Sequence, residues 1–484
     1  MDLIRDKMLK TGLLFIIVLL TLNNLAAGLY YGDETVPYSA RLLSRYISYT
    51  SVTGNETAAG IYLSDLARDK GFVVEILTDE PGSFNFTASL YPLSEGKPNI
   101  VFLNHIDVVP ADDRGEYTYP PFSGTIADGK VWGRGSIDMK GMAIMQLLAL
   151  QNYIELAAKY DLPLNFTMLS VSGEETGGMT GAKIISDQFI DLLNPVVVYG
   201  EGGTGIRSVC KRDQEQIIFG VSVTFKRRLW LHLTLRQYTP ATGRGETNNY
   251  VHEEMVEALI RLTQKKQKVH FSEQALTMFH ELGKLEGGFK GLMLKNSRIF
   301  RPLVVPAMKH NTLFHTMITN SINITGINTI HGPHYSSGQS ITATLDCRLL
   351  PGVDTDRFIK DVIRTINNSA IELTVLHEDN NAAPTDPDQY FNLKKQALKK
   401  VFPGSAVIPV LFPAANDNNY FRIHNIPAYG VLPACLPVHL IETIHNVDER
   451  LPIEALEKGL KVYVHLIKLI LDSANEEQNQ WDID

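Results

Sequence analysis

Hydrophobic and polar positions follow two periods along the chain after residue 35, and these periods predict alternating strands and helices. Short apolar runs at 99–103, 164–171 and 195–199 predict strands, of the kind that is buried on both faces of a sheet. Segments of helical period occur at 57–70, 141–160 and 178–190, and a further strand is predicted at 72–77. We therefore expect an α/β fold in which helices cover a mixed sheet.

The pattern changes near residue 216. Strands are predicted at 216–224, 229–236, 341–348 and 371–377, with helices at 250–265 and 354–367, whereas the stretch 266–338 has no regular period. These units predict a smaller α/β sandwich domain of the lid or dimerisation type at 214–378. It is inserted into a larger domain formed by 33–213 and 379–484, which ends with a helix predicted at 453–473.

The N-terminal segment, 1–32, is basic at first and then apolar. Three basic residues precede an uncharged run from residue 11 to residue 32. This order is typical of a secretory signal peptide, and the run is also about long enough for a membrane anchor, which needs roughly 20 residues. Either reading predicts a protein that is secreted or membrane-anchored, with its main part outside the cytoplasm.

Composition and charge narrow the choice of partners. With 44% apolar residues the chain is globular, and a net charge of −8 without a basic stripe argues against nucleic acid. The cysteines at 210, 347 and 435 lie far apart in the sequence, so they form neither a disulfide framework nor a thiolate metal site.

Acidic and histidine side chains follow the predicted strands. His105 and Asp107 come at the end of the 99–103 run, and residues two apart on a strand point the same way. Asp107 can therefore hydrogen-bond the far nitrogen of His105 and fix its tautomer, although a solvated strand end would show the same pair. Asp138 lies directly before a predicted helix, where its carboxylate could bridge two cations or simply cap the helix.

Glu174 and Glu175 are adjacent at the end of the 164–171 strand. Two neighbouring carboxylates in a dry pocket are unfavourable if both are free and ionised, and a division into a metal ligand (Glu175) and a general base (Glu174) resolves this. A solvated loop is the alternative. Glu201 follows the next strand, and His445 lies in a distant polar loop. Together these imidazoles and carboxylates suit a pair of zinc ions.

At these residues the chain resembles the co-catalytic zinc metallopeptidases that include carboxypeptidase S, aminoacylase, carnosinase and N-fatty-acyl amino acid synthase/hydrolase. The resemblance covers roughly 40–205 and 340–470. It rests on Asn-His-Ile-Asp-Val-Val-Pro at 104–110, Gly-Arg-Gly-Ser-Ile-Asp-Met-Lys-Gly at 133–141, Gly-Glu-Glu-Thr-Gly-Gly at 173–178 and Ile-His-Asn at 444–446. It implies that the larger domain is catalytic. It also implies the single-metal ligands His105 and Glu201 or Glu175, the bridging ligand Asp138, the second-ion ligand His445, the base Glu174 and the orienting residue Asp107.

The chain departs from the relatives in three places. Gly200 stands where many of them have an aspartate ligand, so Glu201 is expected to serve instead. The stretch 235–245 has no histidine where relatives carry one that stabilises the oxyanion, and Arg244 is a candidate substitute. The segment 334–338 replaces an asparagine motif that contacts the substrate carboxylate.

The resemblance implies a di-zinc hydrolase of carboxypeptidase type, which cleaves the amide bond next to a C-terminal amino acid. Arg348 is a candidate substrate contact, or else a salt-bridge partner of Asp346. Two alternatives are an N-acyl amino acid hydrolase/synthase with lipid-like substrates and a diverged, weakly active metal-binding protein. Two Zn²⁺ ions are the expected cofactors, with other divalent metals as alternatives. A small peptide or N-acyl amino acid is the expected substrate, and a homodimer is usual among relatives.

Overall fold

A computed structural model of the chain describes residues 36–111, 115–210, 212–237, 251–309, 312–330 and 339–481. The predicted signal or anchor at 1–32, Arg244 and the segment 334–338 lie outside these residues. Within the described ranges, no helix combines the length and the apolar character that crossing a bilayer would require.

The larger domain is built on a mixed sheet of eight strands, in the order β1-β2-β6-β3-β7-β14-β8-β13. Neighbours β6, β3, β7 and β14 run parallel, whereas β1, β2 and β6 pair antiparallel. The mixed α/β fold that the sequence predicts is therefore confirmed. The strands are β1 (Val73–Glu80), β2 (Ser83–Ser89), β3 (Asn99–His105), β6 (Asn165–Val171), β7 (Pro195–Ile206), β8 (Ile218–Phe225), β13 (Ala406–Phe412) and β14 (Ala428–Cys435).

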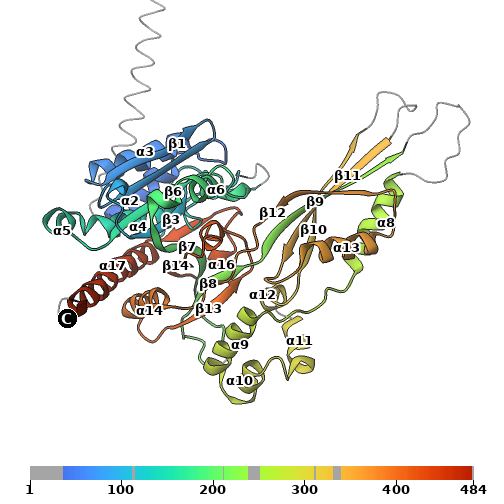
Figure 1. The fold of residues 1–484 in the computed structure, drawn as a ribbon. Coiled ribbons are helices and arrows are strands. Elements are labelled where there is room, and N and C mark those ends of the chain that lie inside the picture. Colours follow the sequence, from blue (N-terminus) through green and yellow to red (C-terminus); the bar gives the residue numbers. More distant parts are fainter. Residues whose placement is uncertain are drawn as a thin grey trace, which may run out of the picture.

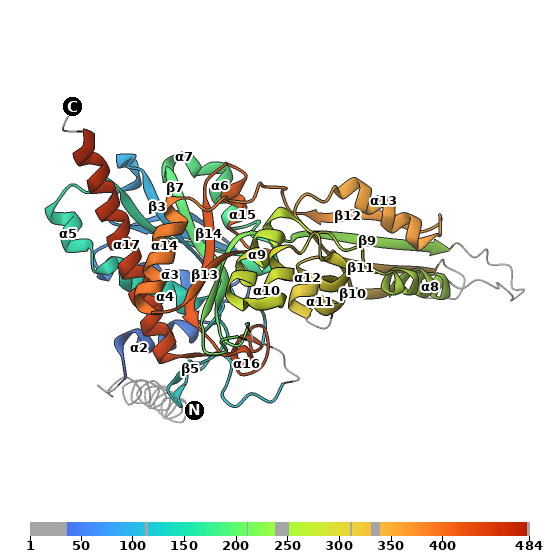
Figure 2. The ribbon, with the colours of Figure 1, turned by 90° about the horizontal axis from the view of Figure 1, so that it is seen from below.

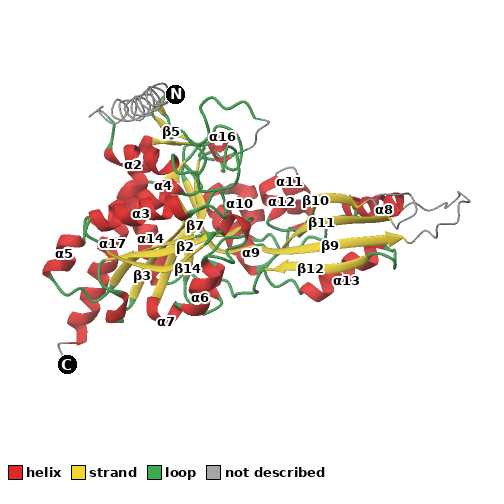
Figure 3. Ribbon diagram, turned by 90° about the horizontal axis from the view of Figure 1, so that it is seen from above, coloured by secondary structure: helices red, strands yellow, loops and turns green. Residues whose placement is uncertain are grey.

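Helices cover both faces of this sheet because its central strands are apolar on both sides (Figure 3). In β3, Ile100 and Phe102 join one core and Val101 and Leu103 join the other, as the period of two requires. The first core is closed by α2 (Tyr38–Ile47), α3 (Thr57–Asp69), α4 (Lys140–Gln151), α14 (Gln389–Val401) and α17 (Ile453–Trp481). The second is closed by η1 (Leu93–Glu95), α6 (Ala182–Gln188), α7 (Ile190–Leu193) and α15 (Asn419–Arg422).

The long helix predicted at 141–160 is two helices. α4 ends at Gln151, and a shorter α5 (Ile154–Lys159) follows. The Asn152 side-chain amide donates to the carbonyl oxygens of Leu148 and Ala149, at 2.7 and 3.3 Å, and so satisfies the last turn of α4. This is the local competition with helix continuation that asparagine offers.

The smaller domain is a four-stranded antiparallel sheet, in the order β10-β11-β9-β12. Alternate leucines of β9, from Leu229 to Leu235, face a core shared with two helices, which makes the predicted two-layer sandwich. Figures 1 and 2 show it reaching away from the larger domain. Its elements are β9 (Arg227–Gln237), α8 (Val251–Gln264), β10 (Ser321–Ile330), β11 (Gln339–Leu349), α13 (Thr355–Ile366) and β12 (Glu372–Glu378).

Two segments differ from the sequence-based expectation. The strand predicted at 216–224 was assigned to the inserted domain, but β8 pairs with β13, β14 and β7 in the large sheet. The stretch without a regular period contains α9 (Glu273–Glu286), α10 (Gly288–Lys295), α11 (Arg301–Lys309) and α12 (Thr312–Thr316). α9 packs against β13, and a Cβ on Gly283 would lie 2.6 Å from the Gly291 carbonyl oxygen. α9 and α10 can therefore pack this closely only with glycine at these positions. The same glycines interrupt the apolar pattern from which the two helices could have been predicted.

Candidate active site

The acidic and histidine side chains gather where parallel strands end. β3 ends at His105, and the chain after β6 turns into the short helix η2 (Glu174–Thr176). In open α/β sheets such carboxyl ends line the ligand crevice. Residues far apart in the sequence therefore meet at one edge of the large sheet.

One candidate ligand group consists of His105, Asp138 and Glu201. The Nε2 atom of His105 lies 3.1 Å from Asp138 Oδ1 and 3.8 Å from Glu201 Oε2. The three donor atoms all lie within 4.8 Å of one another, which is close enough for one cation to contact each of them.

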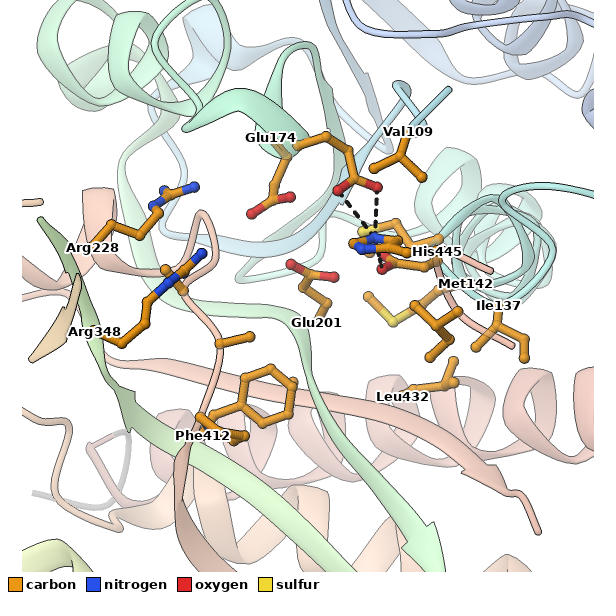
Figure 4. Close-up of a pocket in the computed structure, with 18 residues that line it drawn as sticks. Val109, Ile137, Met142, Glu174, Glu201, Arg228, Arg348, Phe412, Leu432 and His445 are labelled. Carbon is orange, nitrogen blue, oxygen red and sulfur yellow. Dashed lines mark hydrogen bonds and ion pairs between the residues drawn. The ribbon is translucent and has the colours of Figure 1, made fainter. Parts of the chain in front are cut away.

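A second group consists of Asp138, Glu175 and His445. The Nε2 atom of His445 lies 3.1 Å from Asp138 Oδ2 and 3.1 Å from Glu175 Oε2 (Figure 4). Asp138 is thus common to both groups, with one oxygen directed to each histidine. All five predicted metal ligands are brought together.

Asp138 is held by a loop that a buried glutamate organises. Glu449 accepts hydrogen bonds from the backbone N–H groups of Gly135, Ile137 and Asp138, at 2.8–3.1 Å, and from the guanidinium of Arg134 at 2.9 Å. A three-stranded sheet of β4 (Ile126–Ala127), β5 (Lys130–Trp132) and β15 (Arg450–Pro452) keeps the two chain segments together. Glu449 had no role in the sequence analysis, because its partners are more than 300 residues away.

Asp107 links His105 to the loop that carries the two glutamates. The His105 Nδ1 atom donates to the backbone carbonyl of Asp107 at 2.9 Å, whereas the Asp107 carboxylate is 3.4 Å away. That carboxylate instead accepts from Thr53 Oγ1 and from the backbone N–H groups of Glu174 and Glu175, at 2.8–3.1 Å. The His105 ring N–H, which was expected to donate to the Asp107 carboxylate, thus donates chiefly to the backbone carbonyl of the same residue.

Glu201 lies within β7 rather than after it. The pairing of β7 with β14 shifts register between Gly200 and Gly203, and such an irregularity turns a side chain away from the regular alternation. The side-chain amides of Asn416 and Asn418 donate to the Glu201 carbonyl oxygen at 3.1 and 2.8 Å. These contacts fix the backbone from which Glu201 reaches the site.

The site concentrates negative charge. Burial raises the pKa of Glu201 to about 7, and burial together with Glu201 and Asp417 raises the pKa of Glu174 well above its usual range. Hydrogen bonds to Asp138 and Glu175 raise the pKa of His445 to about 10. Several buried carboxylates lie close to two imidazoles, and cations between them would offset the mutual repulsion of the carboxylates. The donor set therefore fits two divalent cations.

A cavity of about 530 Å³ opens beside these ligands, and its two ends differ in chemistry. Arg228 and Arg348 lie at one end, facing Glu174 and Glu201, whereas Met142 and Leu432 lie at the other (Figure 4). Further apolar lining comes from Val109, Ile137, Phe412 and Ile444. The arginines belong to strands of the smaller domain, so both domains form the cavity.

Each of the two arginines pairs with one carboxylate outside the two ligand groups. Arg348 Nε lies 3.0 Å from Asp346 Oδ1, which is the salt bridge that the sequence analysis considered, yet its side chain also lines the cavity. Arg228 donates through Nε to Asp379 at 3.2 Å, and His377 Nε2 contacts the same carboxylate at 2.9 Å. We did not single out Arg228, although three successive basic residues between apolar strands were a signal that could have found it.

Asp417 is a further acidic residue that the sequence analysis missed. Its side chain is 3% exposed, and neither carboxylate oxygen has a hydrogen-bond partner among the described residues. Burial raises its pKa to about 8, and it contributes in turn to the raised pKa of Glu174. It adds a further buried acidic group beside the two ligand groups.

Comparison with known proteins agrees with this site. The model of peptidase family M20/M25/M40 matches residues 101–469. A probable carboxypeptidase S-like protein 2 of Dictyostelium discoideum is 24% identical over 78% of this chain and 72% of its own length. The human N-fatty-acyl-amino acid synthase/hydrolase PM20D1 is also 24% identical, over 78% of this chain and 76% of its own.

A solved structure shows the same fold. The M20 family metallo-carboxypeptidase Sso-CP2 of Sulfolobus solfataricus superposes with a TM-score of 0.66, at 17% identity, over 90% of this chain and 100% of that one. The resemblance stated from the motifs is confirmed. The chain belongs to peptidase family M20/M25/M40 and is a hydrolase of that family.

Proposed function

We propose that this protein is a carboxypeptidase-type amidohydrolase that uses two divalent metal ions, zinc in the first place. Its substrate carries a free carboxylate on the amino acid that is released. The observation that carries the proposal is the sharing of Asp138 between two ligand groups beside Glu174, with two arginines across the cavity.

The residues that would hold the ions follow from the two groups. His105 and Glu201 would bind one ion, His445 and Glu175 the other, and Asp138 both. Bound there, the ions would supply Lewis acidity to the amide carbonyl and to the attacking water.

Glu174 is suited to move protons between water and the leaving amine. Its carboxylate lines the cavity without being a member of either ligand group, and burial raises its pKa. A carboxyl group within reach of both water and the leaving amine can accept a proton from water and then donate it to the amine nitrogen. Asp107 supports this role because it holds the backbone N–H groups of Glu174 and Glu175.

The two ends of the cavity give the substrate a direction. A free carboxylate would be attracted to Arg228 and Arg348, which places the amino-acid half on the side of Glu174. The acyl or aminoacyl half then faces Met142 and Leu432. The scissile amide would lie between these ends, next to the ligand groups.

An N-acyl amino acid hydrolase/synthase that acts on lipid-like substrates is the second candidate. The apolar end of the cavity favours it, because Ile137, Met142 and Leu432 offer no polar partner for an aminoacyl group. The third reading, a weakly active metal-binding protein, is less favoured because such a protein would need the ligands but not Glu174. Export or membrane anchoring is proposed from the N-terminal pattern alone.

The test is amide hydrolysis by the zinc-loaded full chain, compared with Glu174→Gln. A pooled panel of dipeptides and N-acyl amino acids is followed by mass spectrometry, and bound zinc is measured for each protein. We expect the variant to keep its zinc and to lose on the order of a hundredfold to ten-thousandfold in rate. Glu155→Gln, an exposed change of the same kind on α5, should behave as the parent protein.

Equal turnover by the parent and Glu174→Gln, with equal zinc content, would contradict the role of Glu174. No turnover of any panel member by the zinc-loaded parent would favour the metal-binding reading instead. Preference for dipeptides or for acylated amino acids decides between the first two candidates.

A further inference from the structure

The segment 288–309, formed by α10, a turn and α11, presents large apolar side chains to solvent. Phe289 is 66% exposed, Leu292 48%, Ile299 76% and Leu303 57%. Singly exposed apolar residues are common on proteins, whereas several large ones on one short segment mark a candidate contact surface. We call this segment the α10–α11 surface.

The same segment is strongly basic. It contains five basic residues and no acidic residue, in a chain whose net charge is −8. All five are exposed, namely Lys290, Lys295, Arg298, Arg301 and Lys309. Arg298 pairs with Glu273 at 2.6 Å, whereas no ion pair joins any of the three lysines to a described carboxylate.

Buried side chains attach the α10–α11 surface to the rest of the protein. Val304 and Met308 of α11 are buried in the core that also contains Phe279 of α9 and Leu411 of β13. α10 packs closely on α9, with Gly291 against Gly283. The surface is therefore attached to the large sheet, and in Figure 1 it lies at the outer edge of the molecule.

We propose that the α10–α11 surface docks onto an anionic lipid bilayer and lies in its interface. Apolar side chains flanked by lysine and arginine match a membrane whose headgroups are negative and whose interior is apolar. A protein partner is the weaker alternative, because lysine is depleted from protein–protein interfaces. α10 and α11 are too short to cross a bilayer, so the contact is peripheral.

The test places a reporter on the surface itself. Ile299→Cys is labelled with an environment-sensitive fluorophore in the full chain, in a Cys435→Ser background, because Cys210 and Cys347 are buried. The protein is mixed with vesicles of equal parts phosphatidylserine and phosphatidylcholine, or of phosphatidylcholine alone. We expect a blue shift and quenching by spin-labelled lipid with the anionic vesicles, and neither with the neutral ones. Attachment through residues 1–32 alone would leave the emission from position 299 unchanged.

Charge reversal supplies the matched comparison. Lys290→Glu with Lys295→Glu should raise the vesicle concentration needed for the half-maximal shift on the order of tenfold or more. Lys399→Glu with Lys400→Glu, two exposed residues on α14, changes the net charge equally and should have little effect. Equal shifts with neutral vesicles, no shift at all, or indifference to the Lys290 and Lys295 reversals would overturn the proposal. A shift that depends on protein concentration without vesicles would instead identify a second copy of the chain as the partner.

Discussion

Lys394 is a lysine in the main core that the proposed chemistry does not use. Its side chain is 1% exposed, and its Nζ atom has no hydrogen-bond partner among the described residues. The rings of Tyr463 and Tyr199 lie 4.1 and 5.3 Å from it, centroid to Nζ. Burial lowers the pKa of Lys394 to about 7, so the folded protein disfavours its charged form.

Replacing Lys394 by methionine should stabilise the protein at neutral pH. The unfolded chain binds more protons than the folded one between about pH 7 and pH 10.5, so the parent's free energy of unfolding rises with pH in that window. Urea unfolding should show Lys394→Met more stable by a few kcal/mol near pH 7, since one pKa unit is about 1.4 kcal/mol. The difference should shrink towards pH 10.5, and a difference independent of pH would contradict a charge-based cause.

Arg228 should determine whether a free carboxylate is recognised. For substrates with a free C-terminal carboxylate, Arg228→Leu should lower kcat/KM by roughly tenfold or more, because a charge-assisted contact is lost. The matching C-terminal amides should lose much less. Arg236→Leu, an exposed arginine on the same strand, is the control. An equal loss for acids and amides would show that Arg228 acts only through folding, for example through its pair with Asp379.

The predicted ligands could be found from sequence because each follows an apolar strand or lies in a specific motif. Asp417 could not be found in this way, and Arg228 only as one of three successive basic residues, since their place in the site depends on how the two domains and two distant loops meet. Arg348 was ambiguous for a similar reason. Its pair with Asp346 and its place in the cavity are both present, and the local sequence cannot separate them.

The loop that carries Asp138 depends on an element far away in the chain. Glu449, at the start of the segment that leads to α17, satisfies three backbone N–H groups and the guanidinium of Arg134. Buried polar groups that lose their partner keep the full cost of desolvation. The position of Asp138, the proposed bridging ligand, therefore depends on Glu449.

Replacing Glu449 should disturb the proposed metal centre, although Glu449 is not one of the proposed ligands. We expect the free energy of unfolding of Glu449→Ala to be about 3–5 kcal/mol lower than that of the parent, because a buried ion pair is broken. We also expect this variant to bind zinc more weakly. Glu449→Gln, which keeps one acceptor oxygen, should lie between this variant and the parent. Calorimetric zinc titration and chemical unfolding check both effects, and unchanged zinc affinity in Glu449→Ala would show that the loop holds Asp138 by itself.

Elements with a regular apolar pattern could be predicted, and those defined by their neighbours could not. β3, β6 and α13 lie close to the expected ranges. β8 has the expected strand pattern, but nothing in that pattern tells which sheet it joins. α9 and α10 were hidden because the glycines that let them touch interrupt the helical period.

The described part of the molecule contains several separate cores. The smaller sandwich has its own core from β9, β11, α8 and α13, distinct from the core around the large sheet. All proposed metal ligands belong to the larger domain. Unfolding of the two parts should therefore respond differently to zinc.

Scanning calorimetry should show two transitions, and zinc should raise the temperature of only one. A ligand at about a hundred times its Kd stabilises the folded form by roughly 2.7 kcal/mol, so removal of zinc by a chelator should lower the transition of the larger domain. The other transition should stay in place. A single transition that moves as a whole would show that the domains unfold together.

Two of the connections between the domains lie at Lys226–Arg228 and next to Asp379, and the Arg228–Asp379 pair joins these two connections. The proposed metal ligands belong to the larger domain, whereas Arg228 and Arg348 belong to strands of the smaller one. The angle between the domains therefore sets the distance between the two arginines and the proposed metal ligands. If the proposed function holds, substitutions in these connections change the length of the amino-acid half that the cavity accepts while every proposed ligand stays unchanged.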